Sequence, residues 1–348
     1  MAIVGRDGLH LAKGRDLKNQ HPKDERSKNQ HSKGRHLKSP THAAVNSDAG
    51  HRARSLRWGV LLAGMAAIST GAIFARWAMQ SAGRSDWGFG LWLAAGRVTL
   101  AALAVAPAWP QTWRSPRSAW PWAVGAGACL ALHFVCWLSS LGYTSIAAST
   151  VLVTTTPVWV AIATSVITQK FAGWITWAGL AIALAGSAVI ALSQDAGTIG
   201  SDPLLGNGLA LAGALAAAGY LLLGRVAQQR GLTLGSYAAL AYGSAALLLS
   251  PLVALWGGGW QTITPTTVLA IALSALVPQL IGHTSFNWLV TQMPPLWVTL
   301  AILFEPVGAS SLGWVVFGEQ PGVGVLLGGV IVLLGVVLVV LGGRSTQG

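Results

Sequence analysis

Two charged residues, Arg97 and Glu305, stand in the middle of long apolar segments of the sequence. A charged side chain at the centre of a membrane costs roughly 3 kcal/mol unless it is paired or hydrated, so such residues often mark substrate or ion pathways. Arg97 could hold an anionic substrate group, such as a carboxylate, through two parallel hydrogen bonds. Glu305 could bind a substrate amine or carry a coupling proton. The alternative is a structural ion pair that fixes helix packing.

Each of two prolines follows a polar residue at the same depth: Thr156 precedes Pro157, and Glu305 precedes Pro306. A proline inside a helix frees the carbonyl group four residues earlier, which is Val153 in the first case. Polar backbone at this depth is tolerated where it faces a cavity or other protein. We therefore expect helix kinks at both prolines and a central substrate site beside them; two kinks that serve packing alone are the alternative.

Further polar and aromatic residues fall in the same apolar segments. Asn287 lies four residues after His283, and Gln279 lies four before it, so an α-helix would place all three on one face. Trp137 lies too deep for an interfacial belt and could stack on a substrate. His283, Asn287 and Trp137 are therefore candidate binding residues, although a lone histidine or tryptophan in a span could also serve packing alone.

The sequence offers little for enzymatic chemistry. It has no cluster with zinc-ligand spacing and no phosphate-binding loop, so we expect neither a metal nor a cofactor. An enzyme should have two or more acid, base or metal-binding groups that converge, and only Glu305 is such a group near the predicted midplane. Without an ATP-binding motif, transport would be facilitated or driven by an ion gradient.

The segments that carry these residues predict an all-α membrane protein. Only 9% of the residues are charged and 53% are hydrophobic, which suits a chain surrounded mostly by lipid. From Trp58 onward, apolar runs of about 20 residues match the length that crosses a hydrocarbon core of about 30 Å. We predict ten transmembrane helices near 58–78, 87–107, 120–141, 146–168, 172–192, 204–226, 236–256, 268–290, 296–317 and 323–341.

The charges between these spans predict the orientation of the chain. If the basic N-terminal region is inside, most positive loop charges fall on the same side, as the positive-inside rule requires. The predicted inner residues are Arg114, Arg117, Lys170, Arg225, Arg230 and Arg344, and the outer ones are Arg84, Asp86, Asp195, Asp202 and Glu319. We therefore expect a multi-pass protein of the cytoplasmic membrane with both termini in the cytoplasm.

Residues 1–57 differ in composition from the rest of the chain. They hold 13 of the 22 Lys and Arg residues and almost no residues that could form a core, so we predict a disordered basic cytoplasmic tail. The tail has no aromatic residue to stack on bases, and we expect no nucleic acid partner. A true translation start near Val45 is a further interpretation of this region.

The sequence matches itself when it is shifted by 149 residues. The matched pairs are Gly59 with Gly208, Gly64 with Gly213, Arg76 with Arg225, Pro157 with Pro306, Gly179 with Gly328 and Gly186 with Gly335. The match predicts two copies of a five-helix unit, at 58–193 and 204–341. Because five is odd, the second copy enters the membrane upside down, and inverted repeats of this kind are typical of secondary transporters.

The stretch from Phe304 to Glu319 resembles the EamA domain of the drug/metabolite transporter superfamily. The shared features are a proline in the fourth helix of each unit, a Gly-Glu pair at the end of that helix and a glycine-rich helix after it. Arg97 also matches a common position of the family. The first copy has Thr168-Gln-Lys170 in place of Gly-Glu. The resemblance implies a ten-helix transporter of two EamA units and says little about its substrate.

These observations predict a secondary transporter that exports a small metabolite, such as an amino acid, by alternating access. Its partners would be the lipid bilayer and a small-molecule substrate, and a homo-oligomer is compatible with the sequence. A nucleotide-sugar or lipid-linked carrier or flippase is a competing transport function. A membrane enzyme or a non-transporting scaffold is the alternative from another class.

Overall fold

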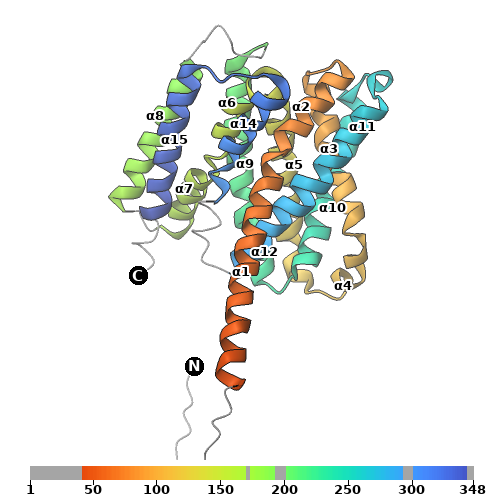
Figure 1. The fold of residues 1–348 in the computed structure, drawn as a ribbon. Coiled ribbons are helices and arrows are strands. Elements are labelled where there is room, and N and C mark those ends of the chain that lie inside the picture. Colours follow the sequence, from red (N-terminus) through yellow and green to blue (C-terminus); the bar gives the residue numbers. More distant parts are fainter. Residues whose placement is uncertain (1–40, 170–172, 193–200, 293–300, 343–348) are drawn as a thin grey trace, which may run out of the picture. The chain divides into compact units, whose positions relative to one another are not determined.

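The computed structural model describes residues 41–169, 173–192, 201–292 and 301–342. Residues 49–348 belong to one compact unit, which is the subject below, and residues 1–48 to another. All regular elements of the described residues are helices (Figure 1). The long ones are α1 (Thr41–Ser69), α2 (Gly71–Ala82), α3 (Trp87–Ala104), α5 (Trp120–Tyr143), α6 (Ile146–Val153), α7 (Thr156–Thr168), α8 (Trp174–Leu192), α9 (Pro203–Gln229), α10 (Leu234–Leu252), α11 (Pro265–Ser274), α12 (Thr284–Gln292), α14 (Glu305–Phe317) and α15 (Val323–Gly342).

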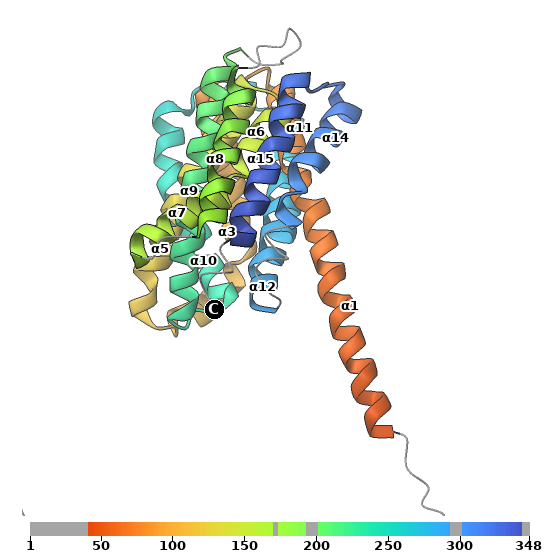
Figure 2. The same ribbon diagram turned by 90° about the vertical axis from the view of Figure 1, so that its left-hand side faces the viewer.

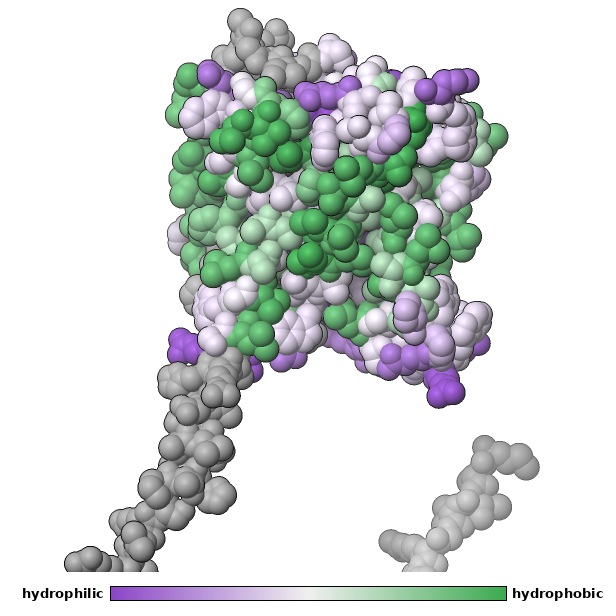
Figure 3. All heavy atoms as spheres, turned by 45° about the vertical axis from the view of Figure 1, so that its right-hand side comes forward, coloured by the Kyte–Doolittle hydropathy of each residue, from purple (hydrophilic) through white to green (hydrophobic). Residues whose placement is uncertain are grey.

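Eight helical segments of the described residues are long and apolar enough to cross a membrane, and the apolar helix at 174–190 is shorter. The surface is that expected of a protein that crosses a membrane, since apolar side chains form a band between two more polar ends (Figure 3). The predicted span at 296–317 begins in a segment outside the described residues, so the number of ten helices stays a prediction. Residues 41–57 of the predicted tail belong to α1, while residues 1–40 lie outside the description.

Short loops at one end of the bundle are connected by side-chain hydrogen bonds. Asp86 caps α3 by accepting a hydrogen bond from the Phe89 amide at 3.3 Å. Arg84 donates to both carboxylate oxygens of Asp86, at 2.9 and 2.8 Å, and thereby lowers the pKa of Asp86. Arg84 also donates to the carbonyl groups of Gly257 and Gly258. The loop before α3 is thus fixed to the loop after α10.

The predicted spans that contain the two prolines are interrupted helices. α6 ends at Val153 and α7 begins at Thr156, with Thr154 and Thr155 in a turn between them. The same turn precedes α14, which begins at Glu305. In both helices the proline is the second residue, where its missing N–H group costs no helical hydrogen bond.

α8 and α15 pack against each other through two glycine contacts. A Cβ atom built on Gly179 would lie 2.7 Å from the Gly335 carbonyl oxygen, and one on Gly186 would lie 2.8 Å from that of Gly328. The two helices are neighbours along their length (Figure 2). The 149-residue shift exchanges the two contacts, because it moves Gly179 onto Gly328 and Gly186 onto Gly335. Such reciprocal, antiparallel contacts are what two inverted copies would produce.

We predict that Gly186→Leu destabilises the protein, because the added atoms would overlap the backbone of α15. Overpacking of this kind costs about 1–3 kcal/mol. Thermal unfolding of the purified protein in detergent should show a midpoint several degrees lower. Gly208→Leu is the matched control, since no atom lies within 4 Å of a Cβ at Gly208. Equal midpoints for both variants would contradict the close packing of α8 and α15.

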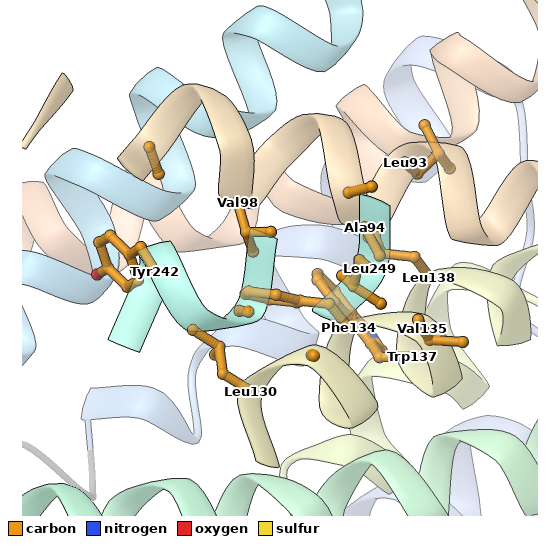
Figure 4. Packing of buried hydrophobic residues seen from close by; sticks show 14 of the residues in the cluster. Leu93, Ala94, Val98, Leu130, Phe134, Val135, Trp137, Leu138, Tyr242 and Leu249 are labelled. Carbon is orange, nitrogen blue, oxygen red and sulfur yellow. The ribbon is translucent and has the colours of Figure 1, made fainter. Parts of the chain in front are cut away.

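The largest core cluster joins α2, α3, α5 and α10. Figure 4 shows Leu93, Ala94 and Val98 of α3 near Phe134 and Trp137 of α5. Arg97 belongs to the same stretch of α3 and is completely buried.

Candidate functional site

Arg97 is completely buried and is held from two sides. Its Nε atom donates a hydrogen bond to Oε1 of Gln279 at 3.0 Å. Its guanidinium carbon lies 4.4 Å from the ring centroid of Phe134 and 5.6 Å from that of Trp137. Cation–π contacts of this kind are strongest where water is excluded. Residues of α5 and of the segment before α12 therefore fix the plane of the guanidinium group.

The same side chains carry buried donors that have no hydrogen-bond partner among the described residues. They are Nη1 and Nη2 of Arg97, Nε1 of Trp137 and Nε2 of Gln279. An unsatisfied buried donor costs about 1–3 kcal/mol, so a group of them calls for a ligand or ordered water. All four are N–H donors, and their natural ligand is a group that only accepts hydrogen bonds, such as a carboxylate.

Glu305 is 7% exposed and opens α14. Its charge interacts with that of Arg97 across the interior. Among the described residues, however, neither an ion pair within 4 Å nor a hydrogen bond to the Glu305 side chain is present. The structure thus brings the two predicted midplane charges into one region without joining them as a salt bridge.

Thr156 lies at the start of α7 and uses its hydroxyl group on the backbone. The hydroxyl donates to the Val153 carbonyl at 2.9 Å, the one that Pro157 leaves free, and reaches the Ala214 carbonyl of α9 at 3.3 Å. No described hydrogen bond connects Thr156 with Arg97 or Glu305. Its observed role is therefore to satisfy the interrupted backbone and to connect α7 with α9.

Gln279, His283 and Asn287 contact three different partners. The first two belong to η5 (Ala275–His283), a π-helix that contains Pro278. Gln279 faces Arg97, while the Asn287 amide donates to the Tyr220 hydroxyl at 3.3 Å. The His283 ring lies edge-on to Phe134 with centroids 6.0 Å apart. π-Helical turns frequently occur at functional sites, and this one positions Gln279.

Sequence reasoning did not give Gln279 and Phe134 a role beside Arg97. The glutamine was visible only as a neighbour of His283, and phenylalanine in an apolar run carries no distinguishing signal. Trp137 lies against Arg97, and its ring is stacked on that of His133 with centroids 6.0 Å apart. His133 itself has its Nδ1 atom 2.9 Å from the Gly213 carbonyl oxygen. Within the described residues, no three of His, Cys, Asp and Glu lie together as they would around a metal ion.

A buried ion pair connects Arg76 and Glu319. Nη2 of Arg76 lies 3.1 Å from Oε1 of Glu319 and also donates to the Thr144 carbonyl at 3.0 Å. The Ile146 amide donates to both carboxylate oxygens of Glu319 at 3.3 Å. Thr144 in turn donates to Asn207 of α9 at 3.0 Å. Arg76 is from the first repeat and Glu319 from the second, so this pair connects the two.

The interior around Arg97 is closely packed. Two small cavities of about 10 Å³ each are lined mainly by residues of α7 and α8, and Arg97 lines neither. A space of that size holds at most about one water molecule. A substrate therefore reaches Arg97 only if helices separate.

Comparison with known proteins identifies the chain. No curated protein matches it. A solved structure described only as "Crystal structure of protein" aligns with a TM-score of 0.54 and 19% identity over 83% of this chain and 99% of the other, which supports the fold alone. The model of the EamA-like transporter family matches twice, at residues 57–192 and 204–341, close to the repeats predicted from sequence. The chain is thus a multi-pass membrane protein that belongs to the EamA-like transporter family.

Proposed function

We propose that this protein is a secondary transporter that exports a small carboxylate-bearing metabolite, such as an amino acid, across the cytoplasmic membrane. The observation that carries the proposal is the set of four N–H donors on Arg97, Trp137 and Gln279 that find no hydrogen-bond partner among the described residues. A substrate carboxylate would accept hydrogen bonds from both Nη atoms of Arg97, and such charge-assisted pairs are about twice as strong as neutral ones.

Glu305 completes the proposed site. It is buried and lies close enough to Arg97 for the two charges to attract each other. In the proposed mechanism, Glu305 binds the amine of an amino acid or carries the proton that drives export. A carboxylate in a span is a frequent proton carrier in transporters. His283, Asn287 and Trp137 line the path beside this site, and the interrupted helices at Pro157 and Pro306 allow the bundle to open.

Alternating access requires that each end of the bundle can close. We assign closure of one end to the Arg76–Glu319 pair, because it is buried and connects the repeats. The repeat register aligns Arg76 with Arg225 and Glu319 with Lys170, so the equivalent sequence positions carry two positive charges. The ion pair therefore has no equivalent at the other end of the bundle, and breaking it would open only the end where it lies.

We predict that Glu319→Gln makes this end open more often. Removing one partner of a buried ion pair costs about 3–5 kcal/mol, because the other charge stays buried. A cysteine at Thr144, which is 1% exposed, reports on the opening in a variant without Cys129 and Cys136. Labelling by a membrane-impermeant maleimide should become at least five-fold faster.

The charge-exchanged variant Arg76→Glu with Glu319→Arg should restore slow labelling. Asp202→Asn is the control, since it also neutralises one carboxylate, but Asp202 is exposed and caps the adjacent helix α9. Labelling rates that do not change in Glu319→Gln would contradict the proposed closure.

The proposed function is tested by transport into proteoliposomes with a panel of unlabelled competitors. Amino acids and related carboxylates should compete with one another, and their methyl esters should not. Uptake of nucleotide sugars or lipid-linked sugars alone would favour the competing carrier function. Purified protein that binds and transports no member of the panel would favour a scaffold.

A further inference from the structure

Helix α4 (Trp109–Trp113) lies at one end of the bundle (Figure 1). Arginine and tryptophan side chains stack on one another near this helix. The guanidinium carbon of Arg117 lies 4.1 Å from the ring centroid of Trp120 and 5.1 Å from that of Trp113. The guanidinium carbon of Arg230 lies 4.6 Å from the ring centroid of Trp122. We call Arg114, Arg117 and Arg230, with Trp113, Trp120 and Trp122, the arginine–tryptophan cluster.

Hydrogen bonds and close contacts hold the cluster in place and connect two loops. Nε1 of Trp120 donates to the Ser115 hydroxyl at 3.1 Å, and that hydroxyl donates to the Thr112 carbonyl at 2.6 Å. A Cβ atom built on Gly231 would lie 3.3 Å from Cγ of Pro116, so the loop after α9 touches the loop before α5. One loop belongs to each repeat, and the arginines of both are held at a common edge.

Among the described residues, these arginines have no acidic partner. The sequence holds no Asp or Glu between Asp86 and Asp195 or between Asp202 and Glu305. Within the described part of the chain, the only two ion pairs are Arg84–Asp86 and Arg76–Glu319, and neither involves the cluster. No acidic side chain of the described residues neutralises the positive charge of the cluster, which suits it to bind an anion.

We propose that the arginine–tryptophan cluster binds the phosphate headgroup of an anionic phospholipid. Tryptophan concentrates at the headgroup level of a bilayer, and the cluster lies at the ends of membrane-spanning helices. Arg114, Arg117 and Arg230 are all exposed, so a headgroup can approach them from outside the protein. Exposed apolar side chains of α5, Val124 and Leu132, continue from the cluster towards the membrane interior and would contact the acyl chains. The inference does not depend on the transported substrate.

The proposal is tested by native mass spectrometry of the whole protein, titrated in neutral detergent with phosphatidylglycerol or phosphatidylcholine. Phosphatidylglycerol should bind at least ten-fold more tightly. Because a surface arginine contributes about 1 kcal/mol to binding of an anionic headgroup, Arg117→Gln with Arg230→Gln should weaken binding roughly 30-fold.

Arg54→Gln with Arg225→Gln is the matched control. It removes the same charge from two exposed arginines that, within the described residues, stack on no aromatic ring. This control should lose less than three-fold in affinity, and unchanged thermal unfolding would show that both double variants are folded. If both double variants lost the same affinity for phosphatidylglycerol, net charge alone would explain the binding, and the proposed site would be wrong. Equal binding of the two lipids, or displacement of phosphatidylglycerol by millimolar inorganic phosphate, would also overturn it.

Discussion

Substitution of Arg97 by glutamine is expected to abolish substrate binding and transport while the protein still reaches the membrane. Arg97 offers both Nη atoms to a ligand, and each hydrogen bond from a charged group contributes about 1.5–3 kcal/mol. Loss of both corresponds to at least about 3 kcal/mol, or roughly a 100-fold weaker Kd. Binding of a substrate from the competitor panel, measured by calorimetry, would report the change.

Folding should tolerate this substitution, because it removes a buried charge whose desolvation opposes folding. Thermal unfolding without substrate should therefore be unchanged or shifted upward. Arg97→Lys keeps the charge but cannot make two parallel hydrogen bonds, and we expect it to lose at least ten-fold in affinity. A marked loss of membrane abundance in Arg97→Gln, with normal transport per molecule, would instead assign Arg97 to a structural pair with Glu305.

The second large effect is expected at Glu305. If this carboxylate carries the coupling proton, Glu305→Gln cannot exchange it, and transport should no longer respond to an imposed pH gradient. The measurement compares transport in proteoliposomes with and without a gradient of one pH unit. The wild type should be stimulated several-fold and the variant not at all, while exchange of substrate for substrate should continue.

Asp202→Asn is the control for this experiment, since Asp202 is an exposed carboxylate that caps α9. It should remain coupled. Stimulation of Glu305→Gln equal to that of the wild type would remove Glu305 from the coupling mechanism. Loss of binding for amino acids but not for amine-free acids would assign it to the substrate amine.

The extent of the helices could be predicted because it depends on local composition. The span predicted at 120–141 is helix α5 (Trp120–Tyr143), and that predicted at 87–107 is α3 (Trp87–Ala104). The internal repeat could also be recognised from the sequence, since the matched glycines and prolines all lie 149 residues apart. The π-helix at Ala275–His283 was not predictable, because its distinction from an α-helix is a hydrogen-bond shift of one residue that composition does not record.

The site could be predicted only in part, because local composition does not show which distant residues come into contact. The cost of burying charge singles out Arg97 and Glu305 in any sequence. Their surroundings depend on which helices pack together, and no local pattern indicates that Gln279 meets Arg97 over a separation of 182 residues. The Arg76–Glu319 pair joins residues 243 positions apart, and no local pattern indicated it either.

The central proposal is that Arg97 recognises a substrate carboxylate, and a double comparison tests it most directly. Binding of the best carboxylate of the panel and of its neutral amide is measured in the wild type and in Arg97→Gln. We expect the wild type to prefer the acid by about 100-fold and Arg97→Gln to bind the two ligands equally. A preference for the acid that persists in Arg97→Gln would contradict the proposal.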